Sequence, residues 1–112
     1  MQFRTRKQLD EIRDAAAFIL DRTRGLSSQV YENDRLLRQA VERNFEIIGE
    51  AMNRLRKDDP SVASQVTDAD RIVAFRNVLI HGYDSVNLST IWNTIQSDLP
   101  TLRHQLANIP PG

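Results

Sequence analysis

The segment from Arg76 to Tyr83, with the sequence RNVLIHGY, places an arginine, a histidine and a phenol close together. The guanidinium of Arg76 keeps its charge in proteins, and the imidazole of His81 is the side chain best suited to proton transfer near neutral pH. Metal-free cleavage of RNA needs such groups. A base takes the proton of the 2′-hydroxyl, an acid protonates the leaving 5′-oxygen, and cations stabilise the transition state.

The two side chains cannot share these roles freely. Arg76 does not deprotonate and is excluded as the base. His81 suits either role, although a helix C-terminus before Gly82 would favour the imidazolium and an acid role. On one ideal helix, residues five apart lie roughly 140° apart around the axis. Either the helix therefore ends before His81, or a second chain completes the site, as in a twofold dimer.

Taken alone, an Arg-x4-His spacing occurs by chance in many proteins. On that interpretation His81 is a helix-end residue and Arg76 belongs to a surface ion pair. The other histidine, His104, lies beside Arg103 and is expected to be solvated. The chain has no cysteine and two histidines, which excludes thiolate chemistry and leaves little for a metal site. We expect neither a metal nor a cofactor.

The composition predicts one globular domain over residues 1–112. Hydrophobic residues make up 40% of the chain and charged residues 27%, which argues against disorder. Fifteen basic residues balance fifteen acidic ones, so any RNA contact must use a local patch. No apolar run approaches the ~20 residues that span a bilayer, and no signal peptide is apparent. A cytoplasmic location is expected.

Apolar residues recur at helical spacing in the first half of the chain. A capping box from Thr5 to Gln8 predicts a first helix over about 6–24, which Gly25 ends. A polar link from Leu26 to Asn33 follows. A second helix is expected over roughly 34–57, with an apolar face wide enough to pack against two neighbours, one of which could be another chain. Gly49 within it suggests a close approach by a neighbouring helix.

The second half continues the helical pattern. A short helical turn is expected near 61–66, and Thr67 can cap a third helix that Gly82 ends. A last helix runs from Leu88 and should kink at Pro100, because proline removes one backbone hydrogen bond. Residues 109–112 form a frayed tail. The sequence therefore predicts an all-α, up-and-down bundle of about four main helices.

The residues around the motif resemble a known family. The segment AVERNFEIIGEA from Ala40 to Ala51, the segment FRNVLIHGY from Phe75 to Tyr83, and Asp98-Leu99-Pro100 are similar to the HepT-like toxins, which have the HEPN fold. The resemblance covers about three-quarters of the chain, from the second helix to Leu102. It is much more specific than the motif alone.

This resemblance implies a homodimeric toxin that cleaves RNA without a metal and is encoded beside a minimal nucleotidyltransferase antitoxin. Arg76 and His81 match the family's Arg-x4-6-His pair, and Asn77 matches the polar residue that commonly follows the arginine. Tyr83 completes the Arg-x4-His-x-Tyr form. In that subgroup the antitoxin transfers AMP to this tyrosine, which implies AMPylation of Tyr83.

Several neighbouring residues have two interpretations. Glu46 and Glu50, one turn apart on the second helix, either orient the site's arginine or histidine or belong to a solvated face with Arg43 and Asn53. Phe45 and Trp92 could stack on bases, but their spacing with other apolar residues predicts core positions.

The leading hypothesis is therefore a toxin ribonuclease. The alternative is a non-catalytic subunit that binds nucleotide or substrate for the neighbouring nucleotidyltransferase, which the neutral net charge slightly favours. The combination of Arg, His and Tyr favours the nuclease, because a scaffold would not need all three. A third possibility is a degenerate HEPN domain that only dimerises.

Overall fold

The computed structural model describes residues 1–67, 71–75, 77 and 88–109, and within them every regular element is helical. Residues 71–75 and 77 are helical as well. The remaining elements are α1 (Phe3–Thr23), α2 (Ser28–Asn33), α3 (Arg35–Asp58), α4 (Pro60–Ala63), α6 (Leu88–Asn93), the π-helical turn η2 (Thr94–Asp98) and α7 (Leu99–Ala107).

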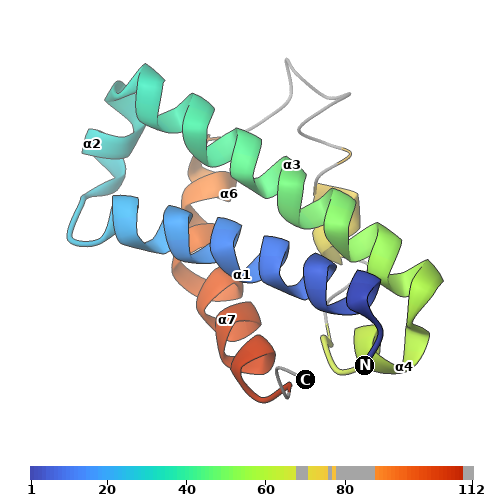
Figure 1. The fold of residues 1–112 in the computed structure, drawn as a ribbon. Coiled ribbons are helices and arrows are strands. Elements are labelled where there is room, and N and C mark those ends of the chain that lie inside the picture. Colours follow the sequence, from blue (N-terminus) through green and yellow to red (C-terminus); the bar gives the residue numbers. More distant parts are fainter. Residues whose placement is uncertain (68–70, 76, 78–87, 110–112) are drawn as a thin grey trace.

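The helices pack into a bundle around one core, which confirms the all-α prediction. The long helices α1 and α3 run antiparallel, side by side, and the chain from α6 to α7 crosses them (Figure 1). The short helix α4 follows the C-terminal end of α3, near the N-terminus of the chain. Fully buried side chains from all three long segments form the core, among them Leu9, Ile12, Ile19, Val41, Met52, Leu55, Ile91, Ile95 and Leu106.

The predicted capping box at the first helix is wrong. Helix α1 begins at Phe3 with Gln2 as its N-cap, so Thr5 already lies inside the helix. The Thr5 hydroxyl donates to Asp59 Oδ2 at 3.3 Å, and Gln8 Nε2 donates to Asp58 Oδ2 at 2.7 Å. Both side chains are buried and bind the end of α3 instead of their own helix. The other end agrees with the prediction, since Gly25 adopts φ +76° directly after the helix.

The expected polar link before the second helix contains a helix of its own. Ser27 accepts a hydrogen bond from the backbone N–H of Val30 and so caps α2. Tyr31 within α2 is fully buried, and its ring lies 5.5 Å from that of Trp92 on α6. Burial of this one aromatic side chain thus attaches a segment of mostly polar residues to the core.

Helix α3 agrees closely with the prediction over 34–57. Asp34 is its N-cap and accepts from the backbone N–H of Leu37 at 3.0 Å. At the other end, Asp59 caps α4 by accepting from the backbone N–H of Val62. The short helical turn expected near 61–66 is therefore confirmed as α4 and the turns that follow it.

The irregularity expected at Pro100 is a π-helical turn that ends just before it. The backbone N–H of Leu99 donates to the carbonyl of Thr94, five residues earlier. Pro100 then occupies the first turn of α7, where its missing N–H is tolerated. The expected fraying from residue 109 is wrong at Ile109, which is buried and whose carbonyl accepts from Arg13 Nη2 at 3.1 Å.

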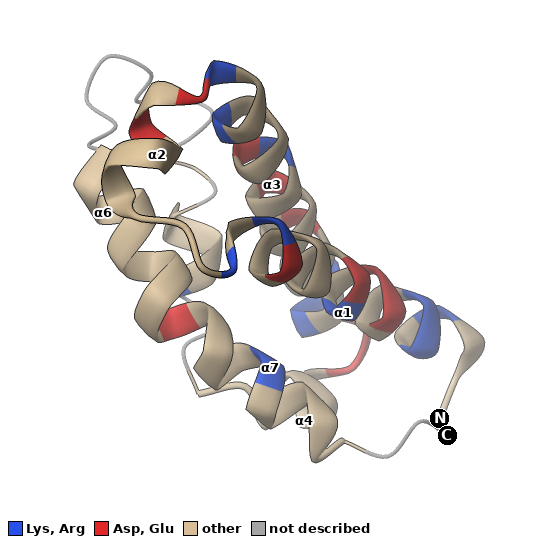
Figure 2. Ribbon diagram, turned by 90° about the vertical axis from the view of Figure 1, so that its left-hand side faces the viewer, with Lys and Arg blue, Asp and Glu red and all other residues tan. Residues whose placement is uncertain are grey.

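Both acidic and basic residues lie along the two long helices. Figure 2 shows them interleaved along α1 and α3, whereas the segment from α6 to α7 carries few charges. Within the described residues, no helix is long and apolar enough to cross a membrane.

Candidate active site

The three residues with the proposed chemical roles, Arg76, His81 and Tyr83, lie outside the described residues, as does Gly82. Asn77 is described: it is helical and exposed. The start of the third helix at 68–70 is likewise outside, so capping by Thr67 stays a prediction. The Thr67 hydroxyl accepts a hydrogen bond from Gln105 Nε2 at 2.7 Å. The described elements nearest to the motif in the sequence are the helical segment 71–77 and α6.

An aromatic contact attaches the helical segment 71–77 to α3. The ring of Phe75, the residue that precedes Arg76 in the chain, meets the ring of Phe45 edge to face, with centroids 5.0 Å apart. Phe45 is 4% exposed, so Phe75 rests on the core itself. Ile72 and Val73 also pack partly against the core. This confirms the core interpretation of Phe45, and Trp92 packs against the same core beside Tyr31.

An ion pair attaches the same segment to the last helix. Arg71 Nη2 lies 3.1 Å from Asp98 Oδ2, and the Asp98 side chain is 28% exposed. Asp98 is the only acidic residue in the sequence from 88 to 109. An exposed ion pair of this kind contributes about 1 kcal/mol or less to stability, so its importance is orientation. It directs the first turn of the segment towards η2.

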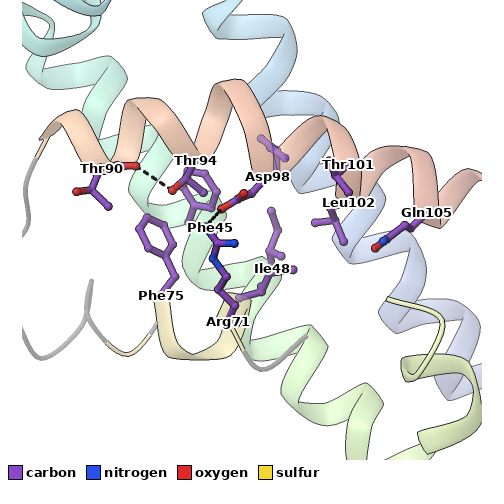
Figure 3. A pocket seen from close by; sticks show the side chains of 12 residues that line it. Phe45, Ile48, Arg71, Phe75, Thr90, Thr94, Asp98, Thr101, Leu102 and Gln105 are labelled. Carbon is purple, nitrogen blue, oxygen red and sulfur yellow. Dashed lines mark hydrogen bonds and ion pairs between the residues drawn. The ribbon is translucent and has the colours of Figure 1, made fainter. Parts of the chain in front are cut away.

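Between these two contacts lies a cavity of about 130 Å³. Its walls come from α3, from the segment 71–75 and from the last helix, as Figure 3 shows. Phe45, Ile48, Phe75 and Leu102 supply apolar surface, and Arg71 with Asp98 supplies charge at one side. Thr90 and Thr94 line the cavity from α6 and η2. The cavity thus adjoins the residue that directly precedes Arg76 in the chain.

Glu46 and Glu50 form ion pairs on the face of α3. Arg43 Nη1 lies 3.2 Å from Glu46 Oε2 and 3.9 Å from Glu50 Oε1, and both carboxylates are partly exposed. Arg43 is one of the two residues that the solvated-face interpretation groups with these glutamates. Whether these carboxylates also orient Arg76 or His81 stays a prediction, because both partners lie outside the described residues.

A second group of polar side chains lies where α2, α3 and α6 meet. The Tyr31 hydroxyl is buried and has no hydrogen-bond partner among the described residues. Burial is the main cause that raises the pKa of Tyr31 far above its ordinary value, with a further contribution from Glu42. Burial also raises the pKa of Glu42, while Arg38 lowers it. The sequence pattern gave no indication of these groups.

Two further predictions concern His104 and metal binding. His104 is exposed, as expected. Within the described part of the chain, no three His, Cys, Asp or Glu residues are close enough to hold a metal ion.

Sequence reasoning missed the pairing of Arg71 with Asp98 and the cavity beside it. The signal that could have found them is a lone charged residue, Asp98, within the otherwise uncharged stretch from 88 to 102.

Comparison with known proteins identifies one family. A family model described as "Ribonuclease HepT-like" matches residues 12–109. The chain is 36% identical over 104 residues to "Putative RNase TTE0752" of Caldanaerobacter subterraneus subsp. tengcongensis, covering 93% of this chain and 92% of that protein.

Two archaeal proteins are also similar. "Probable ribonuclease HepT" of Thermococcus cleftensis is 30% identical over 95 residues, with 85% of this chain and 86% of that protein covered. "Putative RNase MJ1380" of Methanocaldococcus jannaschii is 28% identical over 98 residues, with 88% and 89% covered. No solved structure gives a significant match.

Proposed function

Because this chain belongs to the HepT-like ribonuclease family, we propose that it is the toxin of a toxin–antitoxin pair and a metal-independent endoribonuclease. The observation that carries the proposal is the family match over residues 12–109, which includes the complete Arg76-x4-His81-x-Tyr83 sequence. A toxin of this kind acts in the cytoplasm, where its RNA substrate lies.

The reaction is an internal transesterification. The ribose 2′-oxygen attacks the adjacent phosphorus while a base accepts its proton, and the bond from phosphorus to the 5′-oxygen breaks. His81, as imidazolium, protonates that leaving oxygen. Arg76 stabilises the charge on the equatorial phosphate oxygens, and Asn77 contributes a hydrogen bond. The products are a 2′,3′-cyclic phosphate and a free 5′-hydroxyl.

A homodimer supplies the second proton-transfer group. In a twofold dimer, His81 of one chain can be the acid while that of its partner is the base. The apolar surface of α3 supports association: Leu36 is 80% exposed at the start of the helix, and Val30 on α2 is 50% exposed. Light scattering should give twice the monomer mass of 12.9 kDa. A monomer at micromolar concentration would reject the shared site.

The partner that silences the toxin is a minimal nucleotidyltransferase antitoxin. It transfers AMP from ATP to the Tyr83 hydroxyl, with release of pyrophosphate. Each AMP adds about one negative charge close in sequence to Arg76 and His81, where it competes with the RNA phosphate for the same cations. Co-expression with the antitoxin should add AMP-sized mass steps that are lost in Tyr83→Phe. A Tyr83→Phe toxin that the antitoxin still silences would show control by steric binding.

The test of the nuclease is incubation of the purified protein with total RNA, with and without EDTA, followed by mapping of the ends. Cleavage should continue in EDTA and leave cyclic or 3′-phosphate ends. His81→Ala and Arg76→Ala should abolish it without loss of helical circular dichroism. His104→Ala and Arg103→Ala are matched controls on the exposed face of α7 and should cleave normally. Cleavage that requires added Mg²⁺ would reject the mechanism.

The alternative is a non-catalytic subunit that binds nucleotide or substrate for the nucleotidyltransferase. The balanced charge of 15 basic and 15 acidic residues favours it, because nothing draws the whole molecule to RNA. Growth arrest on expression without the neighbouring gene separates the two, since only a nuclease toxin should cause it.

A further inference from the structure

We propose that the cavity between α3, the segment 71–75 and the last helix receives one pyrimidine base of the RNA, next to the phosphate that is cleaved. This inference rests on the proposed ribonuclease function and names what the enzyme selects in its substrate. Four observations support it: the size of the cavity, its aromatic wall, the charged pair at its side, and its place in the chain relative to Arg76.

The size of the cavity admits one six-membered ring. Its volume is about 130 Å³, and an apolar protein cavity of ~150 Å³ is known to bind benzene. A pyrimidine has a single ring of that size. The cavity is partly open, so the second, fused ring of a purine would extend beyond it towards solvent and make fewer contacts. The size of the cavity therefore favours pyrimidines over purines.

The apolar walls suit the faces of a base. Phe45 and Phe75 both line the cavity, and Ile48 and Leu102 add aliphatic surface (Figure 3). Nucleic-acid bases stack on aromatic side chains without regard to sequence, because every base has a π-face. The walls thus provide affinity for the faces of a flat ring, while the polar groups bind its edge.

The charged pair suits the polar edge of a pyrimidine. Asp98 Oδ2 lies 3.1 Å from Arg71 Nη2, and the Asp98 side chain is 28% exposed. A carboxylate accepts from the amino group of cytosine and equally from the N3–H of uracil. The Arg71 side chain is 68% exposed and can donate to a base carbonyl while it keeps its contact with Asp98. Both pyrimidines therefore find a donor and an acceptor here.

The chain itself puts the cavity next to the proposed chemistry. Phe75 lines the cavity and is bonded directly to Arg76. Consecutive Cα atoms lie about 3.8 Å apart. Because the two residues are consecutive, we assign a base that touches Phe75 to a nucleotide beside the phosphate that Arg76 is proposed to bind.

The first experiment measures binding without catalysis. The amide spectrum of the labelled protein is followed by NMR during titration with CMP, UMP, AMP and GMP. CMP and UMP should shift the amides of Thr94 and Asp98 and bind at least about tenfold more tightly than the purine nucleotides. Equal binding of all four, or shifts confined to other surfaces, would overturn the proposal.

A pair of substitutions at one position separates volume from fold. Thr94→Leu puts a larger side chain into the cavity, whereas Thr94→Val keeps the shape and loses only a hydroxyl that donates to the Thr90 carbonyl of its own helix. Thr94→Leu should abolish the preference for CMP and UMP, and Thr94→Val should keep it. If both variants bind pyrimidines as the wild type does, the cavity is not the base site.

The second experiment maps cleavage ends in an RNA of random sequence. One position beside the cleaved bond should be enriched in pyrimidines at least about tenfold. Asp98→Asn should reduce that enrichment, while Asp21→Asn, which breaks the surface pair with Arg24, should leave it unchanged. Cleavage without any base preference would overturn the base site and leave the ribonuclease intact. If no RNA is cleaved but CMP and UMP bind in the cavity, the ribonuclease fails and the cavity is a site for free nucleotides.

Discussion

The α1–α3 pair and the helical segment 71–77 are attached to the same core in different ways. The facing sides of α1 and α3 are fully buried, with Leu9, Ile12 and Leu55 at 0% exposure. Polar contacts at one end and the Arg54–Glu11 ion pair at 3.0 Å complete that interface. The described part of 71–77 has only partly buried apolar side chains, one aromatic contact and one ion pair.

This difference separates the part that stabilises the fold from the part that precedes the chemistry. Elements that bind ligands or move belong to the less stable end of a protein's range of local stabilities. Substitutions in the α1–α3 interface should therefore lower the free energy of unfolding of the whole domain. Substitutions at the attachments of 71–77 should affect activity more than stability.

The largest effect is expected from a cavity in the α1–α3 interface. Leu55→Ala should lower the free energy of unfolding by about 2–5 kcal/mol, because a fully buried leucine leaves a void when truncated. Gln39→Ala on the same helix is the control, since that side chain is exposed and its loss should cost almost nothing. Urea unfolding of both variants measures the difference. Equal costs would remove the distinction between the two faces of α3.

A substitution at the contact of Phe75 with Phe45 should lower activity strongly and stability only slightly. Phe75→Leu loses the edge-to-face contact with Phe45, which is worth about 1 kcal/mol, yet RNA cleavage should fall at least about tenfold. Phe18→Leu is the control, since Phe18 is also partly buried and loses its contact with Arg22. It should cost similar stability and leave cleavage unchanged. Full activity of Phe75→Leu would show that this contact does not position the motif.

The polar contacts between α1 and the end of α3 should have a moderate effect. Gln8→Ala removes the hydrogen bond to Asp58 and should cost about 1 kcal/mol, since the bond is partly buried and its acceptor is charged. The buried amide oxygen of Gln8 has no hydrogen-bond partner among the described residues. Because the substitution also removes this unpaired acceptor, the net loss of stability is smaller. Lys7→Ala, at the exposed neighbouring position, is the control. If Gln8→Ala lowered the free energy of unfolding more than Leu55→Ala does, polar contacts would contribute most of the stability of this interface.

The sequence predicted those parts of the fold that local patterns determine. The periodicity of the second helix predicted its bounds as roughly 34–57, nearly those of α3. The capping box failed because Thr5 and Gln8 bind carboxylates 54 and 50 residues away in the chain, which no local pattern contains. Helix α2 was missed because its support is Tyr31, a single aromatic residue among polar ones.

The candidate site also has a part that the sequence predicted and a part that it did not. The family could be recognised from residue types and spacing, and the comparison bears out the family. The roles of the motif residues stay a prediction. The Arg71–Asp98 pair and the cavity could not, because they arise where three separate segments meet. Asp98 was quoted only as part of Asp98-Leu99-Pro100, and its partner lies 27 positions earlier in the sequence.

The smallest effect concerns Glu42, on α3 beside the attachment of α2. Burial raises its pKa, so the folded protein holds this proton more tightly than the unfolded chain does. The charged carboxylate therefore disfavours folding above the raised pKa, and this penalty disappears as the pH falls below the ordinary carboxyl range near ~4.3. Glu42→Gln should be more stable than the wild type at pH 8 and equal to it at pH 4, measured by the difference in urea midpoint. Arg38→Gln in both backgrounds should enlarge the difference at pH 8, since Arg38 lowers the pKa of Glu42. A difference that stays constant with pH would show that Glu42 acts through packing and not through its charge.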